Sequence, residues 1–67
     1  MPLIRVELFD FRVTPEVSEE LIAKMTDTLC EVVGEVVREH TRVIVEGHDP
    51  RNWGSGGKPL RVPDMPS

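Results

Sequence analysis

The sequence has very little of what usually stabilises a protein of 67 residues. It contains one cysteine, Cys30, so no disulfide can form within the chain. Ordering so short a chain costs on the order of 100 kcal/mol of conformational entropy, and offsetting that cost would take roughly 4,000 Å² of buried apolar surface. A lone chain of this length has difficulty enclosing so much surface. We therefore expect the protein to associate with further chains.

The chain also lacks a basic cluster and a long hydrophobic run. Twelve acidic residues against eight basic ones give a net charge of −4, which argues against a nucleic-acid partner, because nucleic acids bind clustered Lys and Arg. No apolar run approaches the ~20 residues of a membrane span, and the first residues do not have the pattern of a secretory signal. With a single cysteine, which fits a reducing compartment, we expect a cytoplasmic protein without a membrane partner.

Motifs for metals and phosphates are missing as well. His40 and His48 have no spacing that suits a metal, and exposed polar positions explain them better. The GSGG run at 54–57 lacks the spacing of a phosphate loop and indicates a turn. Cys30 is best interpreted as a small buried apolar residue. We therefore expect no metal site and no phosphate loop.

What the sequence does contain is a strand pattern followed by a helix pattern. Residues 3–9 alternate, with Ile4, Val6 and Leu8 on one side, which predicts a half-buried strand. Thr14, Pro15 and Glu16 form a helix start, because threonine caps, proline suits the first helical position and glutamate suits the positive helix end. Apolar residues then recur every three or four positions up to Gly34, a helix stop, so we predict a helix over 15–33. 

A second strand completes the predicted fold. Residues 36–40 form a turn or one loose helical turn, and the β-branched run 41–46 predicts a strand. Strand, helix and strand in this order give two parallel strands, an α/β (α+β) fold of β-α-β type with open sheet edges that partner chains would close. Residues 47–57 predict a short hairpin or turn, and residues 61–67 a flexible or interface tail. We expect one domain over 1–67.

Three motifs together resemble the 4-oxalocrotonate tautomerase family. They are the PLIRVEL start behind Met1, the strand RVIVE and the run RNWGSGG, and the resemblance covers roughly residues 2–57. It implies a β-α-β protomer, dimers with four-stranded sheets and a hexamer of three dimers, without metal or organic cofactor. It also implies a tautomerase that moves a proton in a small unsaturated 2-hydroxy or 2-oxo acid, such as 2-hydroxymuconate, in aromatic-compound catabolism.

The resemblance assigns roles to four residues. Pro2 is the general base, as an N-terminal secondary amine after removal of Met1. Arg12 holds the distal carboxylate, Arg42 engages the reacting end of the substrate across a subunit boundary, and Trp53 stands where the family has an aromatic wall. The chemistry agrees, since an apolar pocket and nearby guanidinium groups both lower the pKa of an amine toward the operating pH. The same arginines would bind an anionic substrate and stabilise a developing enolate.

One departure keeps alternatives open. The family has glycine before the first arginine, where this chain has Phe11, so a backbone with φ > 0 would be strained there or the turn would bend differently. A hydratase or dehalogenase of an unsaturated acid on the same scaffold is the first alternative, with a carboxylate activating water. A non-catalytic subunit of a mixed hexamer is the second. Arg42 would then form an interface salt bridge and Trp53 would fill an interface.

Overall fold

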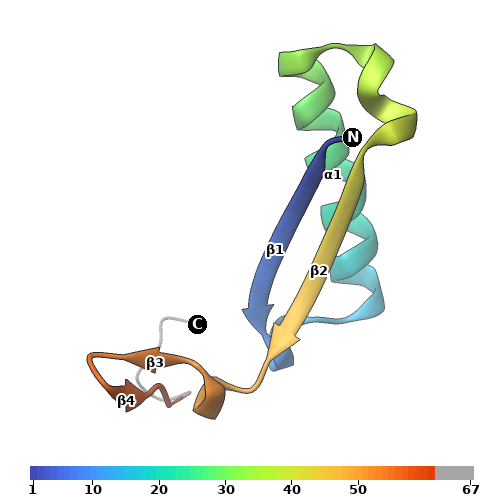
Figure 1. Ribbon diagram of the computed structural model, residues 1–67. Coiled ribbons are helices and arrows are strands. Elements are labelled where there is room, and N and C mark those ends of the chain that lie inside the picture. The colour runs from blue at the N-terminus through green and yellow to red at the C-terminus, as the bar shows by residue number, and fades with distance from the viewer. Residues whose placement is uncertain (62–67) are drawn as a thin grey trace.

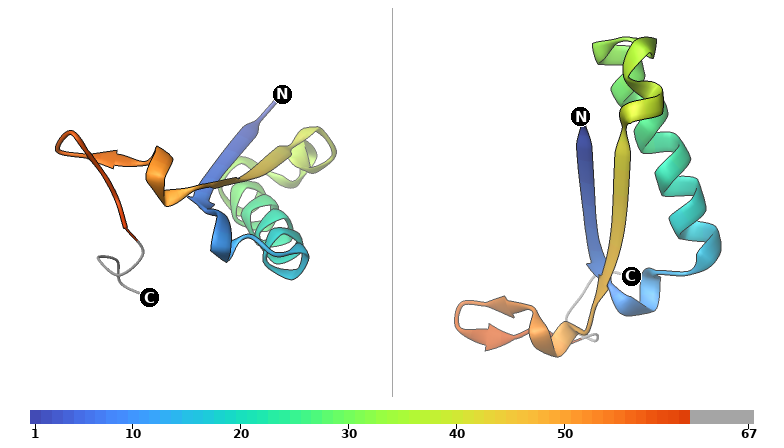
Figure 2. Two further views of the ribbon diagram at one scale, coloured as in Figure 1. Left: turned by 90° about the horizontal axis from the view of Figure 1, so that it is seen from below. Right: turned by 45° about the vertical axis from the view of Figure 1, so that its right-hand side comes forward.

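The chain folds as a two-stranded parallel sheet with one long helix against it, in a computed structural model that describes residues 1–61. Strand β1 spans Leu3–Phe9 and strand β2 spans Arg42–His48. Their register runs from Leu3 opposite Arg42 to Phe9 opposite His48. Helix α1 connects them and lies on one face of the pair (Figures 1 and 2). This confirms the predicted β-α-β fold.

Helix α1 spans Pro15–Val33, the predicted range. At its start the Val17 N–H donates to the Thr14 hydroxyl at 3.1 Å, and Pro15 occupies the first turn. At its end Gly34 has φ of 126°, a backbone conformation that residues other than glycine rarely adopt. The Gly34 N–H donates to the Cys30 carbonyl. Both helix signals in the sequence therefore act as expected.

The core of the protomer is thin. On β1 the residues Ile4, Val6 and Leu8 are half-buried and alternate with exposed ones, as the pattern predicts for a strand covered on one face. Cys30, at 4% exposure, is the one fully buried hydrophobic residue among residues 1–61 and confirms its predicted role as a small buried residue. Leu3 remains 55% exposed on the sheet face that lacks a helix. The single chain thus encloses little apolar surface.

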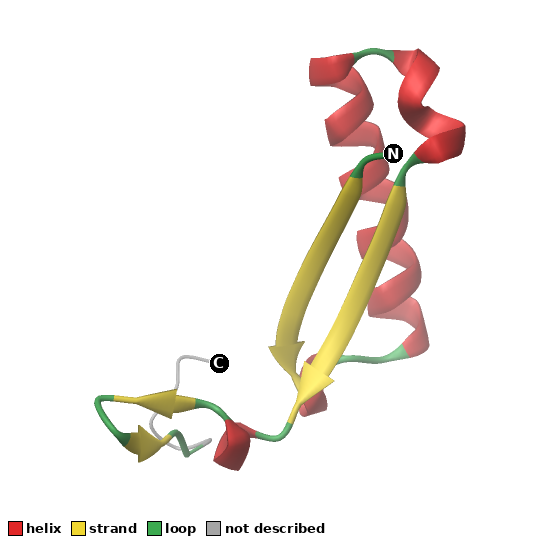
Figure 3. Cartoon of the chain, viewed as in Figure 1, coloured by secondary structure: helices red, strands yellow, loops and turns green. Residues whose placement is uncertain are grey.

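The connections differ in detail from the prediction (Figure 3). The expected connector after β1 contains a short 3-10 helix, η1, over Asp10–Arg12, and the turn before β2 is a second one, η2, over Glu35–His40. Strand β2 runs to His48, two residues beyond the predicted end, because Gly47 continues the pairing with Leu8. Gly47 also lies close to η1: a Cβ there would be 3.1 Å from the Asp10 Cα.

The C-terminal part forms the predicted hairpin. A third 3-10 helix, η3, spans Pro50–Asn52, and strands β3 (Gly54–Ser55) and β4 (Lys58–Pro59) pair antiparallel across a turn with Gly56 and Gly57 at positive φ. The hairpin projects away from the sheet (Figure 1). Of the predicted tail over 61–67, only Arg61 belongs to the described residues. No helix within residues 1–61 is long and apolar enough to cross a membrane.

Replacing Thr14 by alanine tests the helix cap. Removing the hydroxyl leaves the Val17 N–H without its side-chain acceptor, so we expect the free energy of unfolding to fall by about 1 kcal/mol in urea titrations followed by circular dichroism. Thr28→Ala is the matched control, because Thr28 is exposed within the same helix and alanine favours helix there. Equal loss from both variants would contradict the capping role.

Candidate active site

Two of the four predicted site residues lie together at one end of the sheet. Pro2 immediately precedes β1 and Arg42 opens β2. The Arg42 N–H donates to the Pro2 carbonyl at 2.9 Å, and Leu3 pairs with Arg42 in the sheet register. Met1, which precedes Pro2, is 83% exposed. A base at Pro2 would therefore have the backbone of an arginine residue next to it in the same chain.

The other two predicted residues lie at the opposite end. Arg12 ends η1, after β1, and Trp53 follows η3, after β2. The seven residues of β1 separate the two ends by about 23 Å at roughly 3.3 Å per residue. Within a single chain, Pro2 and Arg42 therefore lie at one end of the sheet, and Arg12 and Trp53 lie at the other. The two pairs do not meet.

Phe11, the departure from the family pattern, adopts an ordinary backbone. No residue other than glycine has a positive φ within residues 1–61. The turn bends as the 3-10 helix η1 and needs no glycine at this position. The guanidinium carbon of Arg12 lies 5.3 Å from the centre of the Phe11 ring, within the range of a cation–π contact. Phe11 thus occupies this turn without backbone strain.

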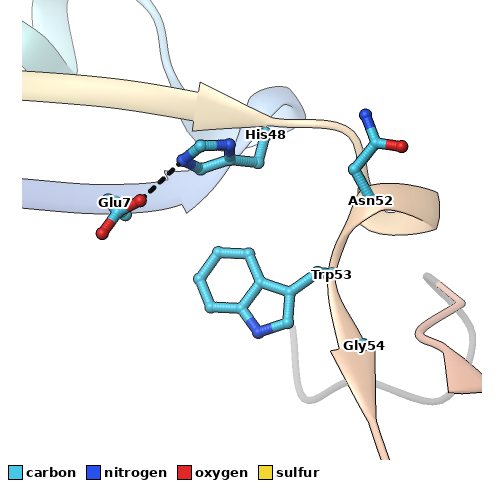
Figure 4. A pocket seen from close by; sticks show the side chains of 5 residues that line it. All are labelled: Glu7, His48, Asn52, Trp53 and Gly54. Carbon is cyan, nitrogen blue, oxygen red and sulfur yellow. Dashed lines mark hydrogen bonds and ion pairs between the residues drawn. The ribbon is translucent and has the colours of Figure 1, made fainter. Parts of the chain in front are cut away.

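Trp53 lines a shallow hollow at the same end as Arg12. The hollow has a volume of about 270 Å³ and is lined by Glu7, His48, Asn52, Trp53 and Gly54 (Figure 4). The Trp53 ring centre is 4.6 Å from that of Phe9, and His48 meets it edge-on at 5.9 Å. An aromatic wall beside a hollow suits the role predicted for Trp53. Pro2, Arg12 and Arg42 do not line this hollow.

A cluster of charged residues on the helix-free sheet face gave no signal in the sequence. His48 Nε2 lies 2.9 Å from a carboxylate oxygen of Glu7, and Arg5 pairs with Glu46 at 3.4 Å. One ligand atom each of Glu7, Glu46 and His48 lies within 4.8 Å of the others, a set that could hold a cation. The imidazole already hydrogen-bonds Glu7, and the guanidinium group already pairs with Glu46. Only the parallel register makes these residues neighbours, and periodicity cannot reveal it.

Asp49 stabilises the turn that carries Trp53. Its carboxylate accepts from the Arg51 side chain and from the Arg51 backbone N–H, and these two hydrogen bonds lower the pKa of Asp49 from 3.8 to about 2. The Trp53 N–H in turn donates to the Pro50 carbonyl, and the Trp53 carbonyl accepts from Leu60. The ion pair at the start of η3 thus belongs to the same turn as the backbone hydrogen bonds of Trp53.

Comparison with known proteins agrees with the observed sheet and helix. The sequence profile of the family described as Tautomerase enzyme matches residues 2–62. The chain belongs to this tautomerase family. Among curated proteins, none matches the sequence.

Solved structures place the tautomerase among 4-oxalocrotonate tautomerase homologues. It is 36% identical to TomN, a 4-oxalocrotonate tautomerase homologue in the tomaymycin biosynthetic pathway, over 87% of this chain and 86% of that one, with a TM-score of 0.75. A 4-oxalocrotonate tautomerase isozyme structure from Methylibium petroleiphilum is 32% identical over 84% and 87% of the two chains, with a TM-score of 0.71. DmpI from Helicobacter pylori is 26% identical over 96% and 100%, with a TM-score of 0.76. The predicted family is confirmed, and with it a tautomerase type of function.

Acid titration tests the link between Asp49 and Trp53. Because the folded-state pKa of Asp49 lies below its ordinary value, its contribution is present above about pH 4 and is lost as the pH falls toward about 2. We expect the fluorescence of Trp53, the only tryptophan, to shift to longer wavelength over this range before the helical circular dichroism is lost. In Asp49→Ala that shift should already be present at neutral pH.

Asp27→Ala serves as the control for this titration, since Asp27 also pairs with an arginine, Arg38, but on α1. Its Trp53 emission should follow the wild type. An identical emission profile in Asp49→Ala and the wild type would contradict the assignment.

Proposed function

We propose that this protein is a cofactor-independent keto–enol tautomerase, in which Pro2 is the general base once Met1 has been removed. The observation that carries the proposal is the family match, which begins at Pro2. In the same chain only the backbone of Arg42 contacts Pro2, and the guanidinium group that acts there is the one predicted to come from a neighbouring chain. While Met1 is attached, the Pro2 nitrogen is an amide without basicity. Its removal creates a secondary amine next to an arginine residue.

The reaction is a proton transfer within a small unsaturated 2-hydroxy acid such as 2-hydroxymuconate. The neutral Pro2 nitrogen accepts the proton of the enol hydroxyl, and negative charge develops on that oxygen. A guanidinium group stabilises this charge, which is the role of Arg42. The protonated nitrogen then donates the same proton to a carbon of the conjugated system, and the ketone forms. Arg12 holds the distal carboxylate and Trp53 excludes water.

A complete site requires a second copy of the chain. Within residues 1–61, both edges of the two-stranded sheet are unpaired. An antiparallel neighbour on either edge would bring the Pro2 end of one chain to the Arg12 and Trp53 end of the other, because antiparallel strands place opposite ends side by side. This supports the proposed four-stranded dimer. The hexamer of three dimers, built from one kind of chain or from two, is proposed from the family resemblance. The whole chain, 1–67, would act as one domain in it.

A hydratase or dehalogenase is the second candidate function, and Glu7 favours it. This reaction needs a carboxylate that activates water beside the substrate, and Glu7 lies in the hollow that Trp53 lines. Its bond to His48 would orient it. The carboxylate lies far from Pro2 of the same chain, so this candidate also needs a second copy. The tautomerase is favoured because the family match supports it directly.

Replacing Pro2 by alanine tests the base. Alanine would replace the secondary amine of Pro2 by a primary amine with a different basicity and geometry. Because general acid–base catalysis contributes typically 10²- to 10⁴-fold, we expect the rate of 2-hydroxymuconate ketonisation to fall by at least about 100-fold. Intact mass must first confirm that Met1 is absent from both proteins. Pro59→Ala is the control, since Pro59 is exposed in β4 and its loss should leave the rate unchanged. Full activity in Pro2→Ala would refute the assignment.

Mixing two inactive variants tests the shared site. If Pro2 and Arg12 of one site come from different chains, a mixed pair of Pro2→Ala and Arg12→Ala chains contains one intact site and one with both changes. Random reassembly of an equal mixture should then restore about a quarter of the wild-type sites. Each variant assayed alone, after the same unfolding and refolding, is the control. No recovery in a mixture shown by mass to contain mixed oligomers would contradict the two-chain site.

A further inference from the structure

The side chain next to Arg12 in sequence is also next to it in space. The guanidinium carbon of Arg12 lies 5.3 Å from the centre of the Phe11 ring. Phe11 is 49% exposed, although burial is the more common environment of a phenylalanine. The half-exposed Phe11 ring interacts with the Arg12 guanidinium group, because the negative face of an aromatic ring attracts a cation.

The Phe11 ring belongs to a series of three rings that ends at the proposed substrate wall. Phe11 and Phe9 are parallel, with an interplanar angle of 2° and ring centres 6.0 Å apart. Phe9 in turn meets Trp53 at 4.6 Å with an angle of 45°. These separations are those of favourable aromatic pairs. Phe9 is part of β1 and pairs with His48 across the sheet, so the middle ring is attached to the most regular element of the fold.

The backbone around this series is also well supported. The Val13 N–H donates to the Asp10 carbonyl at 3.1 Å and closes η1. The absence of a side chain at Gly47 lets η1 approach β2, since a Cβ there would be 3.1 Å from both the Asp10 Cα and a methyl group of Val13. The ring of Phe11 is therefore held by its own turn and by Phe9, independently of any ligand.

We propose that Phe11 is a positioning residue for Arg12. Its ring supports the guanidinium group and reduces the number of conformations open to that side chain, so that Arg12 faces the substrate carboxylate already oriented. Through Phe9 the same series sets Arg12 relative to Trp53. This proposal rests on the proposed function, in which Arg12 binds the carboxylate and Pro2 is the base. Phe11 acts through Arg12 and does not itself contact the reacting atoms.

A different role for Phe11 would leave a different signature. If Phe11 only covered apolar surface between subunits, leucine would replace it with little effect on substrate binding. The effect of changing Phe11 would then be the same with or without Arg12. A role in supporting the guanidinium group requires an aromatic ring and requires Arg12. Two substitutions separate these roles: one keeps an apolar side chain but removes the ring, and the other keeps the ring.

The first experiment compares Phe11→Leu with Phe11→Tyr in the mature protein. An exposed cation–π contact corresponds to about a two- to fivefold change in affinity. We expect Phe11→Leu to raise the KM for 2-hydroxymuconate by that factor with kcat nearly unchanged, and Phe11→Tyr to keep the wild-type KM. Circular dichroism and size-exclusion chromatography must show the same fold and assembly for both. An unchanged KM in Phe11→Leu, or the same rise in both variants, would overturn the proposal.

The second experiment is a double-mutant cycle with Arg12→Ala. If Phe11 acts through Arg12, Phe11→Leu should have no effect on kcat/KM once Arg12 has been removed, whereas independent effects would multiply. Multiplying effects would overturn the proposal. Pro2→Ala in the same assay separates this result from a failure of the proposed function. Full activity of Pro2→Ala would refute Pro2 as the base. A large loss in Pro2→Ala, together with independent effects of Phe11→Leu and Arg12→Ala, would refute only the positioning role of Phe11.

Discussion

The parallel register of the two strands is the constraint on which the rest of the structure depends. Leu3 lies opposite Arg42 and Phe9 opposite His48. Because parallel strands place like ends together, this register collects the N-terminal proline and one arginine at one end of the sheet. The residues that follow the strands, including Arg12 and Trp53, collect at the other end. A strand of seven residues is too long for side chains to bridge, so the site that we propose needs groups from a second chain.

The same register explains why folding and function would require the same association. Helix α1 covers one face of the sheet, and only Cys30 is fully buried among residues 1–61. Leu3 and Ile44 remain exposed on the other face, at 55% and 38%, between charged residues. A second chain on a sheet edge would pair free backbone groups and could cover part of this surface. The contact that stabilises the protomer would then also complete the site.

Local sequence signals predicted the secondary-structure elements, but they could not predict contacts between residues far apart in the sequence. The strand at 3–9 and the helix at 15–33 were predicted at their observed bounds, because alternation, the Thr14 cap and the Gly34 stop are local. The end of β2 was placed two residues early, since the extension depends on pairing with Leu8 and Phe9. The contact of Glu7 with His48 spans 41 positions and has no local signal. The hairpin was predicted from its glycines.

The two ends of the sheet have different physical requirements, and the chain meets them differently. At the Pro2 end Met1 is exposed and the Arg42 N–H donates to the Pro2 carbonyl, and both follow from the start of two strands. The Arg12 end needs a fixed shape, and η1, η3 and three aromatic rings provide it. In the function we propose, substitutions in η1 or η3 would alter the end that binds the substrate carboxylate and leave the strand register at Pro2 unchanged.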